Sequence, residues 1–300
     1  MDITFTFHPM HANRRAVWLV SLLSLAVASP AAAQTSVQFL LVQETHNFDQ
    51  TGTASTVETI GPKSPWTFQV SLEGSNLSAF TGSLSFTSPS GSETTSGTAS
   101  YDSKNDHYSY TSGFSTFSAL NAAFAGGTYD VNYNGTHVPL TLSGNLFPAA
   151  PIIAISGASG TWVGNQFTIQ AGHDLTLSTI FTDAANYGTG NAHVSLSIGG
   201  GNNYNNSLDV FATSGQIVIS AADLIAGQSY EVHANFAGIM SMSDALSPIT
   251  SAAIYTSETG FTLTVAVPEP ATVVTLLGAA GLAVVVALRI RSRRHHSSPL

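Results

Sequence analysis

Short alternations of hydrophobic and polar residues run through the middle of the chain and predict an all-β fold. In residues 66–72 the apolar positions recur every second residue, a period typical of a strand buried on one face. Asn134-Gly135 separates two such alternations, and this pair favours the type I′ turn of a β-hairpin. We expect strands at 37–42, 66–72, 98–102, 107–111, 128–133, 138–142, 175–181, 194–198, 216–220, 229–236, 252–256 and 261–265. Apart from the chain ends, the one helical turn we expect is at 220–225.

Two similar segments suggest how these strands are divided. Residues 125–131 read AGGTYDV and residues 226–232 read AGQSYEV, about one domain length apart. The similarity fits a duplicated domain, and it equally fits two unrelated strands that each follow a glycine turn. Two prolines in residues 147–151 interrupt any strand there. We therefore expect two β-sandwich domains of immunoglobulin or fibronectin type, at 34–147 and 148–266.

The N-terminus has the three parts of a secretory signal peptide. Arg14 and Arg15 precede an apolar core at 16–28, and Ala31-Ala32-Ala33 follows as a cleavage site of small residues. We expect a signal peptide at 1–33 that is cleaved after Ala33, with Ala31 and Ala33 as the recognised residues. Translation starts at Met1 or at Met10, and the sequence leaves both open.

The C-terminus combines an uncharged segment with a basic tail. Residues 271–288 contain no charge and, as a helix, would be long enough to cross a thin bilayer. Basic residues follow at Arg289, Arg291, Arg293 and Arg294. The positive-inside rule places this tail in the cytoplasm and the body of the chain outside. A single transmembrane helix at 271–288 is therefore expected.

A proline-rich tetrapeptide, Val267-Pro268-Glu269-Pro270, precedes that helix. Proline disfavours helix at and before its position, so this stretch should be extended at the outer membrane surface. The tetrapeptide, the apolar helix and the arginine cluster together make residues 267–300 resemble the PEP-CTERM sorting signal of Gram-negative bacteria. The resemblance implies a β-rich ectodomain, an inner-membrane anchor before processing, an exosortase as the processing partner, and a final place at the cell surface or outside the cell.

Composition narrows the classes of function. Charged residues make up 8% of the chain, and cysteine is absent, which excludes disulfides, cysteine nucleophiles and cysteine-ligated metals. Between residues 34 and 267 there are fifteen acidic residues against Lys63 and Lys104. Phosphate backbones would repel such a body, so we expect no nucleic-acid partner.

No motif in the body predicts catalysis. There is no G-x-S-x-G, no H-E-x-x-H and no P-loop, and the histidines are scattered singly, so we expect no enzyme, no catalytic residues and no cofactor. His173 lies directly before Asp174, but neighbouring residues of a strand point to opposite faces. Weak calcium candidates share one hairpin loop: Asp102, Asn105 and Asp106. Because such residues also favour turns, we expect turn chemistry there and no metal.

These patterns predict an exported, non-enzymatic protein of the cell surface or extracellular matrix that associates with exopolysaccharide. The alternative is a carbohydrate-binding module of defined specificity, since sandwich domains stack sugars on exposed aromatic rings. The candidate rings are Tyr101, Tyr108 and Tyr110 on one hairpin, and Trp66 or Trp162 elsewhere. Such tyrosines also stabilise hairpins without any ligand. A glycosidase would need a facing pair of carboxylates, and the sequence singles out no pair.

Overall fold

The described part of the chain is built almost wholly of β-strands. The structure is a computed structural model, and it describes residues 36–59, 64–103, 106–201 and 203–267. One short α-helix and two turns of 3-10 helix interrupt the strands: α1 (Phe117–Ala123), η1 (Leu77–Ala79) and η2 (Ala184–Tyr187). The all-β prediction is therefore confirmed for these residues.

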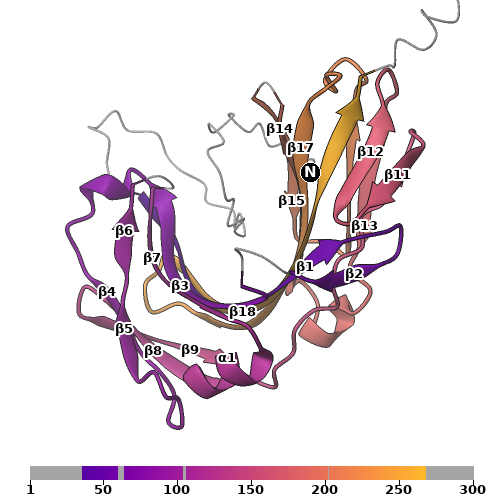
Figure 1. The fold of residues 1–300 in the computed structure, drawn as a ribbon. Helices are drawn as coiled ribbons and strands as arrows, with labels where there is room; N and C mark the ends of the chain where they lie inside the picture. The colour runs from indigo at the N-terminus through magenta and orange to yellow at the C-terminus, as the bar shows by residue number, and fades with distance from the viewer. Residues whose placement is uncertain (1–35, 60–63, 104–105, 202, 268–300) are drawn as a thin grey trace, which may run out of the picture.

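One long, curved sheet organises the molecule (Figure 1). Its central strands are β1 and β18, which pair in parallel although they stand at opposite ends of the described chain. In spatial order its strands are β15 (Tyr204–Val210), β14 (Ala192–Gly200), β17 (Ser229–Ser243), β18 (Thr250–Ala266), β1 (Ser36–Gln50), β3 (Trp66–Ser75), β7 (His107–Phe114) and β6 (Ser100–Asp102). Three further strands join this sheet at its side: β2 (Thr56–Glu58) on β1, β12 (Gln166–Gln170) on β18, and β11 (Gly160–Val163) on β12.

Two smaller sheets pack against opposite ends of the long sheet and make two lobes. In the first lobe the small sheet contains β5 (Ser96–Thr98), β4 (Leu84–Thr87), β8 (Gly127–Tyr133) and β9 (Thr136–Leu142). In the second lobe it contains β10 (Ala154–Ser156), β13 (Leu175–Ile180) and β16 (Ser214–Ile219). Each lobe encloses its own apolar core: Phe68 and Tyr129 belong to the first, and Leu177 and Val232 to the second. Figure 1 shows the lobes rising from the two ends of the curved long sheet.

The expected pair of separate sandwiches is not confirmed, because the long sheet runs through both lobes. Strand β1 comes from the segment expected to form the first domain, yet it pairs with β18 from the segment expected to form the second. The first core also includes Ala253 and Tyr255 of β18. Two-layered packing is therefore present in each lobe, but the lobes share their central strands.

Several strands are longer than the hydrophobic pattern predicts; β17, for example, continues past Phe236 to Ser243. Strand β1 continues past Val42 to Gln50, and β18 joins the expected strands at 252–256 and 261–265 into one. Residues 43–50 and 257–260 are mostly polar, so the pattern fades there. Each segment nevertheless has a hydrogen-bonded neighbour on both sides, which satisfies its backbone whatever its side chains.

The hairpin prediction is confirmed and the helix prediction is wrong. Asn134 and Gly135 both have positive φ, 53° and 86°, as a type I′ turn requires, and they join β8 to β9. Residues 220–225 form a turn without a helix. The α-helix lies instead at α1, where the hydroxyl of Thr116 accepts a hydrogen bond from the backbone N–H of Ala119.

The two similar seven-residue segments share a local geometry but not a place in the fold. In both, a tyrosine is fully buried and its hydroxyl bonds to the preceding turn: Tyr129 donates to the carbonyl of Ala125, and Tyr230 donates to that of Asp223. However, Tyr129 lies on β8 in a small sheet, whereas Tyr230 lies on β17 in the long sheet. The resemblance therefore describes a shared turn into a strand, and the strand order gives no support to duplication.

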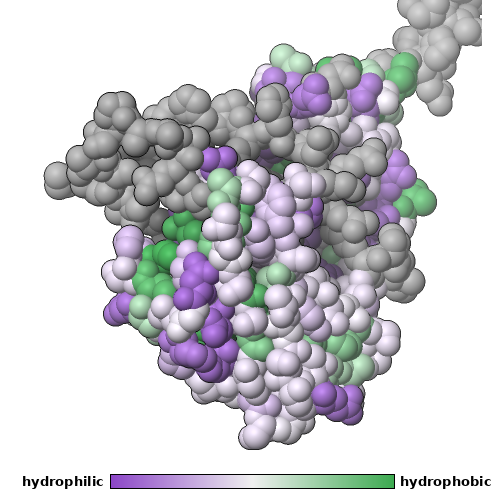
Figure 2. Space-filling model, turned by 90° about the vertical axis from the view of Figure 1, so that its left-hand side faces the viewer, coloured by the Kyte–Doolittle hydropathy of each residue, from purple (hydrophilic) through white to green (hydrophobic). Residues whose placement is uncertain are grey.

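The outer surface on the side of β6 is largely of intermediate hydropathy, with small scattered hydrophilic and hydrophobic areas (Figure 2). This matches a chain in which only 8% of residues are charged. The exposed large hydrophobic residues of the described chain, such as Val163 and Val218, come from separate strands.

Candidate functional site

Alternate side chains of β17, β18 and β1 form a polar face on the long sheet. Residues that alternate along a strand share a face, and those opposite to Val232 and Phe261 are polar near one end of the strands. Further along the same face lies a small buried apolar cluster of Phe39, Leu41, Ile239, Ala252 and Ile254. We define the polar face by these residues: Glu231, His233 and Asn235 of β17, Glu258, Gly260 and Thr262 of β18, and Gln43, Thr45, Asn47 and Asp49 of β1. The other side of the same strands carries the apolar cores.

A cavity of about 210 Å³ opens on this face where β18 changes its parallel neighbour. The pairing of β1 with β18 ends at Asp49 and Gly260, and the pairing of β12 begins at Gln166 and Thr262. Asn165 stands between the two strands, and its carbonyl accepts a hydrogen bond from the backbone N–H of Thr262 at 2.9 Å. The notch between the ends of β1 and β12 leaves room for the cavity. We call it the notch cavity.

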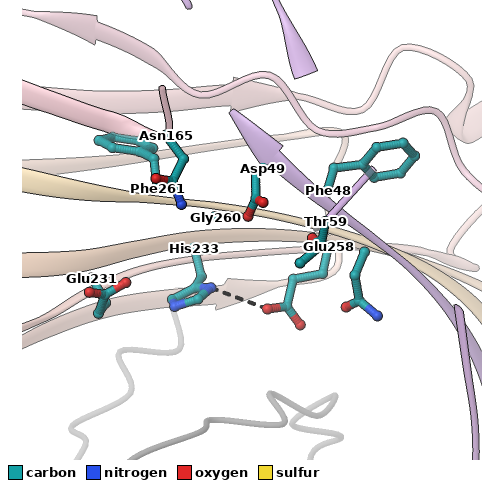
Figure 3. A pocket seen from close by; sticks show the side chains of 10 residues that line it. Phe48, Asp49, Thr59, Asn165, Glu231, His233, Glu258, Gly260 and Phe261 are labelled. Carbon is teal, nitrogen blue, oxygen red and sulfur yellow. Dashed lines mark hydrogen bonds and ion pairs between the residues drawn. The ribbon is translucent and has the colours of Figure 1, made fainter. Parts of the chain in front are cut away.

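Gly260 lies in the middle of the notch cavity and keeps it open. It stands in register with Asp49 on one side and His233 on the other, so the three residues form a row across three strands (Figure 3). A Cβ atom at position 260 would lie 2.9 Å from Nδ1 of His233, which is too close without a shift of the ring. Glycine thus lets the imidazole lie across the strand.

The acidic side chains of the notch cavity come from all three strands. Glu258 bonds through Oε1 to Nδ1 of His233 at 3.1 Å, and both side chains are largely buried, 19% and 24% exposed. Glu231 is exposed, and its Oε1 accepts a hydrogen bond of 3.2 Å from the hydroxyl of Thr262. Asp49 is half-buried and lines the cavity from β1. The described residues include no lysine or arginine to neutralise these carboxylates.

Asn47 also lines the cavity, and its side-chain oxygen Oδ1 accepts no hydrogen bond from a described residue. The residue is 8% exposed, and its Nδ2 donates to the carbonyls of Ser64 and Pro65 at 3.0 and 3.4 Å. This Oδ1 is not one of the buried unpartnered atoms of the described chain, so it is an accessible acceptor in the wall of the cavity.

The same side of the long sheet carries a second group of titratable residues in the first lobe. Burial raises the pKa of Glu73 on β3, while the nearby charge of His107 and a hydrogen bond with Ser71 oppose this shift. His107 is buried and contacts the hydroxyl of Ser109 at 3.1 Å. This group lies far along the strands from the notch cavity, since Glu73 pairs with Phe39 of β1 whereas Asp49 of the same strand lines the cavity.

The aromatic candidates from the sequence pack mainly into the cores. Tyr108 and Tyr110 are half-buried against the first core, and the hydroxyl of Tyr108 donates to the carbonyl of Phe80. Tyr101 packs beside Tyr108 with ring centroids 5.3 Å apart. Trp66 is buried and stacks on His46, and Trp162 packs against the second core. These rings stabilise the lobes, and they do not form an exposed stripe.

Two of the weak calcium candidates, Asp102 and Asp106, lie in the described part of the chain. The carboxylate of Asp106 accepts hydrogen bonds from the backbone N–H groups of Asn76 and Ser78 and from the hydroxyl of Tyr101. Asp106 has a φ of 50°, typical of a turn residue, and Asp102 ends β6. Asn105 lies outside the described residues. Within the described ranges no group of three or more histidine or carboxylate side chains could hold a metal ion.

Sequence reasoning missed how the histidines are paired. Apart from His173, the body histidines contact polar or acidic side chains, and in four of them the partner is a carboxylate on a neighbouring strand. The described ion pairs are His46–Glu58 at 2.9 Å, His137–Asp130 at 2.8 Å, His193–Asp209 at 2.6 Å and His233–Glu258 at 3.1 Å. Only the His137–Asp130 pair could have been predicted from the sequence, because the Asn-Gly turn fixes the register in which β8 and β9 pair. The other partners are set by strand pairing that the turn residues do not specify.

The sorting residues follow directly from the central strand. Strand β18 ends at Ala266, and the exposed Val267 is the last described residue before Pro268. The signal peptide with Ala31 and Ala33, the residues Pro268, Glu269 and Pro270, the expected helix at 271–288 and the four arginines lie outside the described residues. No helix in the described ranges is long and apolar enough to cross a membrane.

Comparison with known protein families identifies the C-terminal segment of the chain. Residues 266–294 match the PEP-CTERM protein-sorting motif, which confirms the resemblance seen in the sequence. No curated protein matches the chain. The matched segment begins at the last residue of β18, so the β-rich body leads straight into the sorting signal. The chain therefore carries a PEP-CTERM sorting motif, which implies export, anchoring in a membrane through the C-terminus, and processing by an exosortase.

Proposed function

We propose that this chain is a non-enzymatic protein of the cell surface or extracellular matrix of a Gram-negative bacterium, associated with exopolysaccharide. The observation that carries the proposal is the sorting motif at residues 266–294, placed directly after a folded, acidic β-rich body. The motif accounts for the route out of the cell. An acidic body with polar sheet faces suits a hydrated extracellular setting, since net charge keeps such a protein soluble.

In this proposal the exosortase cuts near Val267-Pro268-Glu269-Pro270 and leaves the inner membrane anchor behind. The intact mass of the protein, measured from membrane and culture-medium fractions of its native host, tests this step. A mass that ends near Pro268–Pro270, found outside the inner membrane, supports the proposal. A mass that runs to Leu300, found only in the inner membrane, would overturn it.

The alternative proposal is a carbohydrate-binding module with a defined specificity. The notch cavity favours this alternative, because carboxylate and amide groups converge there on a space of limited size. The hairpin tyrosines do not support it, since they pack against the first core. Saturable binding to one glycan, but a flat response to others, would favour the module over general association with a matrix.

A non-enzymatic role fits the environment of the carboxylates better than glycoside hydrolysis does. Glu258 is hydrogen-bonded to His233. Glu231 pairs with Thr262, four residues along β18 from Glu258. A glycosidase needs two carboxylates on opposite sides of one sugar bond. Release of reducing sugar from soluble polysaccharides by the purified chain, lost in Glu231→Gln, would refute the non-enzymatic proposal.

A further inference from the structure

We infer that the free edge of strand β16 is a self-association surface, at which two copies of this chain pair strand to strand and form a symmetric dimer. This surface is independent of the export route and of any glycan. The partner is a second copy of the chain, because the edge is complementary to itself in its backbone groups and its sequence carries no charge.

Strand β16 lies at the edge of the small sheet in the second lobe. It pairs antiparallel with β13 on one side, and no described strand pairs with its other side. Next to the end of this ladder, the N–H of Phe181 donates to the carbonyl of Thr213 at 2.8 Å, as in a hydrogen-bonded pair. Such pairs alternate along an antiparallel ladder, so Ser214, Gln216 and Val218 turn their N–H and C=O groups away from β13.

The outward backbone groups are arranged symmetrically about Gln216. When a second β16 lies antiparallel with the two Gln216 residues opposite each other, Ser214 of each strand faces Val218 of the other. Every outward N–H then meets an outward C=O, as in an ordinary antiparallel ladder. The two small sheets join into one continuous sheet, and the interface is isologous, as it is in most homodimers.

The sequence of β16, SGQIVI, lacks the features that protect edge strands from pairing. It contains no charged residue and no proline, and its register with β13 has no bulge. The side chain of Val218 is 62% exposed, and a second strand beside it would reduce that exposure. Since the chain has a net charge of −9, two copies approach each other at least electrostatic cost along an uncharged strand.

The other edge strands of the described residues are either protected or short. Strand β15 carries Asp209, and β9 contains Pro139. The remaining edge strands are β2, β5, β6 and β10 with 3 residues each, and β11 with 4. Within the described ranges, β16 is therefore the one edge that is both long and unprotected.

The test measures the mass of the particle in solution. Two paired edge strands bury less surface than a standard interface, so we expect a dissociation constant of about 10–100 µM. Sedimentation velocity of the full chain in a mild detergent, from well below to well above that range, should show a monomer that converts reversibly to a dimer. A monomer at every concentration would overturn the inference.

Two variants test the edge itself. Val218→Lys places a charge on the free edge, which is one of the features that prevent strand pairing, and should weaken dimerisation about tenfold. Gln216→Pro removes an outward N–H while it leaves the hydrogen bonds to β13 in place, so it should weaken dimerisation to a similar degree. Thermal unfolding curves show whether each variant keeps the native fold. If Gln216→Pro does not fold, Val218→Lys decides, because its side chain lies on the exposed face.

Val163→Lys is the matched control, since Val163 is an exposed valine on the edge strand β11. It adds the same charge far from the proposed contact and should leave the dimer unchanged. Each added lysine lowers the net charge of an acidic chain, so weaker dimerisation in Val218→Lys alone points to the edge of β16. A dimer that persists in both β16 variants, or that weakens equally in the control, would place the contact elsewhere and refute the inference.

Discussion

Glu44 and Tyr255 stand opposite each other on the parallel strands β1 and β18, inside the core of the first lobe. Glu44 is 2% exposed and Tyr255 is fully buried, and Oε1 of Glu44 has no hydrogen-bond partner among the described residues. Burial raises the pKa of Glu44 to about 8. The pKa of Tyr255 is also raised, first by burial and then by the nearby carboxyl group. The two strands that join the lobes therefore enclose a carboxyl group that is protonated at neutral pH.

Glu44 should make the protein less stable as pH rises. Between its ordinary pKa of 4.5 and the folded value of about 8, the folded chain keeps a proton that the unfolded chain releases. The free energy of unfolding should fall across this window by up to about 5 kcal/mol. In Glu44→Gln this loss should disappear, so the variant becomes more stable than the native chain at pH 8. Urea unfolding at several pH values measures the effect.

Glu93→Gln is the control for that experiment, because Glu93 is exposed. It should leave the slope of stability against pH unchanged. A constant difference between Glu44→Gln and the native chain from pH 5 to pH 8 would contradict a raised pKa at position 44.

The buried tyrosine hydroxyls that fix the two turns should differ in their contribution to stability. The hydroxyl of Tyr230 accepts from the backbone N–H of Ile225 and donates to the carbonyl of Asp223, at 2.9 and 3.0 Å. That of Tyr129 makes one bond, to the carbonyl of Ala125. We expect Tyr230→Phe to cost about 2 kcal/mol and Tyr129→Phe about 1 kcal/mol in denaturant unfolding.

Tyr133→Phe serves as the matched control, since Tyr133 is only partly buried on β8 and its hydroxyl makes no described hydrogen bond. Its effect should stay within about 0.5 kcal/mol. If Tyr129→Phe proved the most costly of the three, the count of hydrogen bonds would not explain the order.

Gly238 on β17 should not tolerate a side chain. A Cβ atom there would run into the ring of Tyr187, which is held in place by a hydrogen bond from its hydroxyl to the carbonyl of Leu146. Overpacking of this kind costs about 1–3 kcal/mol. Thermal unfolding should therefore show a clear loss for Gly238→Ala. Gly199→Ala on β14, where the nearest atoms are at 3.5 and 3.7 Å, should be near neutral, and equal losses would refute the steric explanation.

The sequence predicts best those strands in which one face is apolar. Phe68 and Val232 lie in alternating runs, and both are fully buried as expected. The Asn134-Gly135 hairpin follows from local turn chemistry. Such features depend on neighbours in the chain, so a single sequence is enough to indicate them.

The shared sheet and the notch cavity depend on contacts between distant segments. The polar half of β1 gives no alternation, yet Gln43 donates a hydrogen bond to the hydroxyl of Thr256 on β18. Asp49 and His233 meet across Gly260 only because β1, β18 and β17 are neighbours in the sheet. No local pattern specifies that parallel pairing, and an isolated glycine in a strand does not reveal which side chain occupies its space.

The short distance between the body and the sorting motif should limit processing. The end of β18 is fixed, since the carbonyl of Val265 accepts a hydrogen bond from the N–H of Gly227 at 2.7 Å and its N–H donates to the carbonyl of Gln228 at 3.0 Å. Val267 adds only about 3.5 Å of extended chain before Pro268. A protease that takes an extended substrate must approach the folded sheet closely. Inserting Gly-Ser-Gly-Ser between Val267 and Pro268 should therefore speed conversion to the processed form severalfold in a pulse-chase experiment in the host.

The same four residues inserted after Arg294 provide a control of equal length that leaves the body and the motif at their native separation. That chain should be processed at the native rate. If the insertion before Pro268 slowed conversion while the control did not, the exosortase would be reading the end of β18 together with the motif. The folded strand would then contribute to recognition, and steric obstruction by the body would be the wrong explanation.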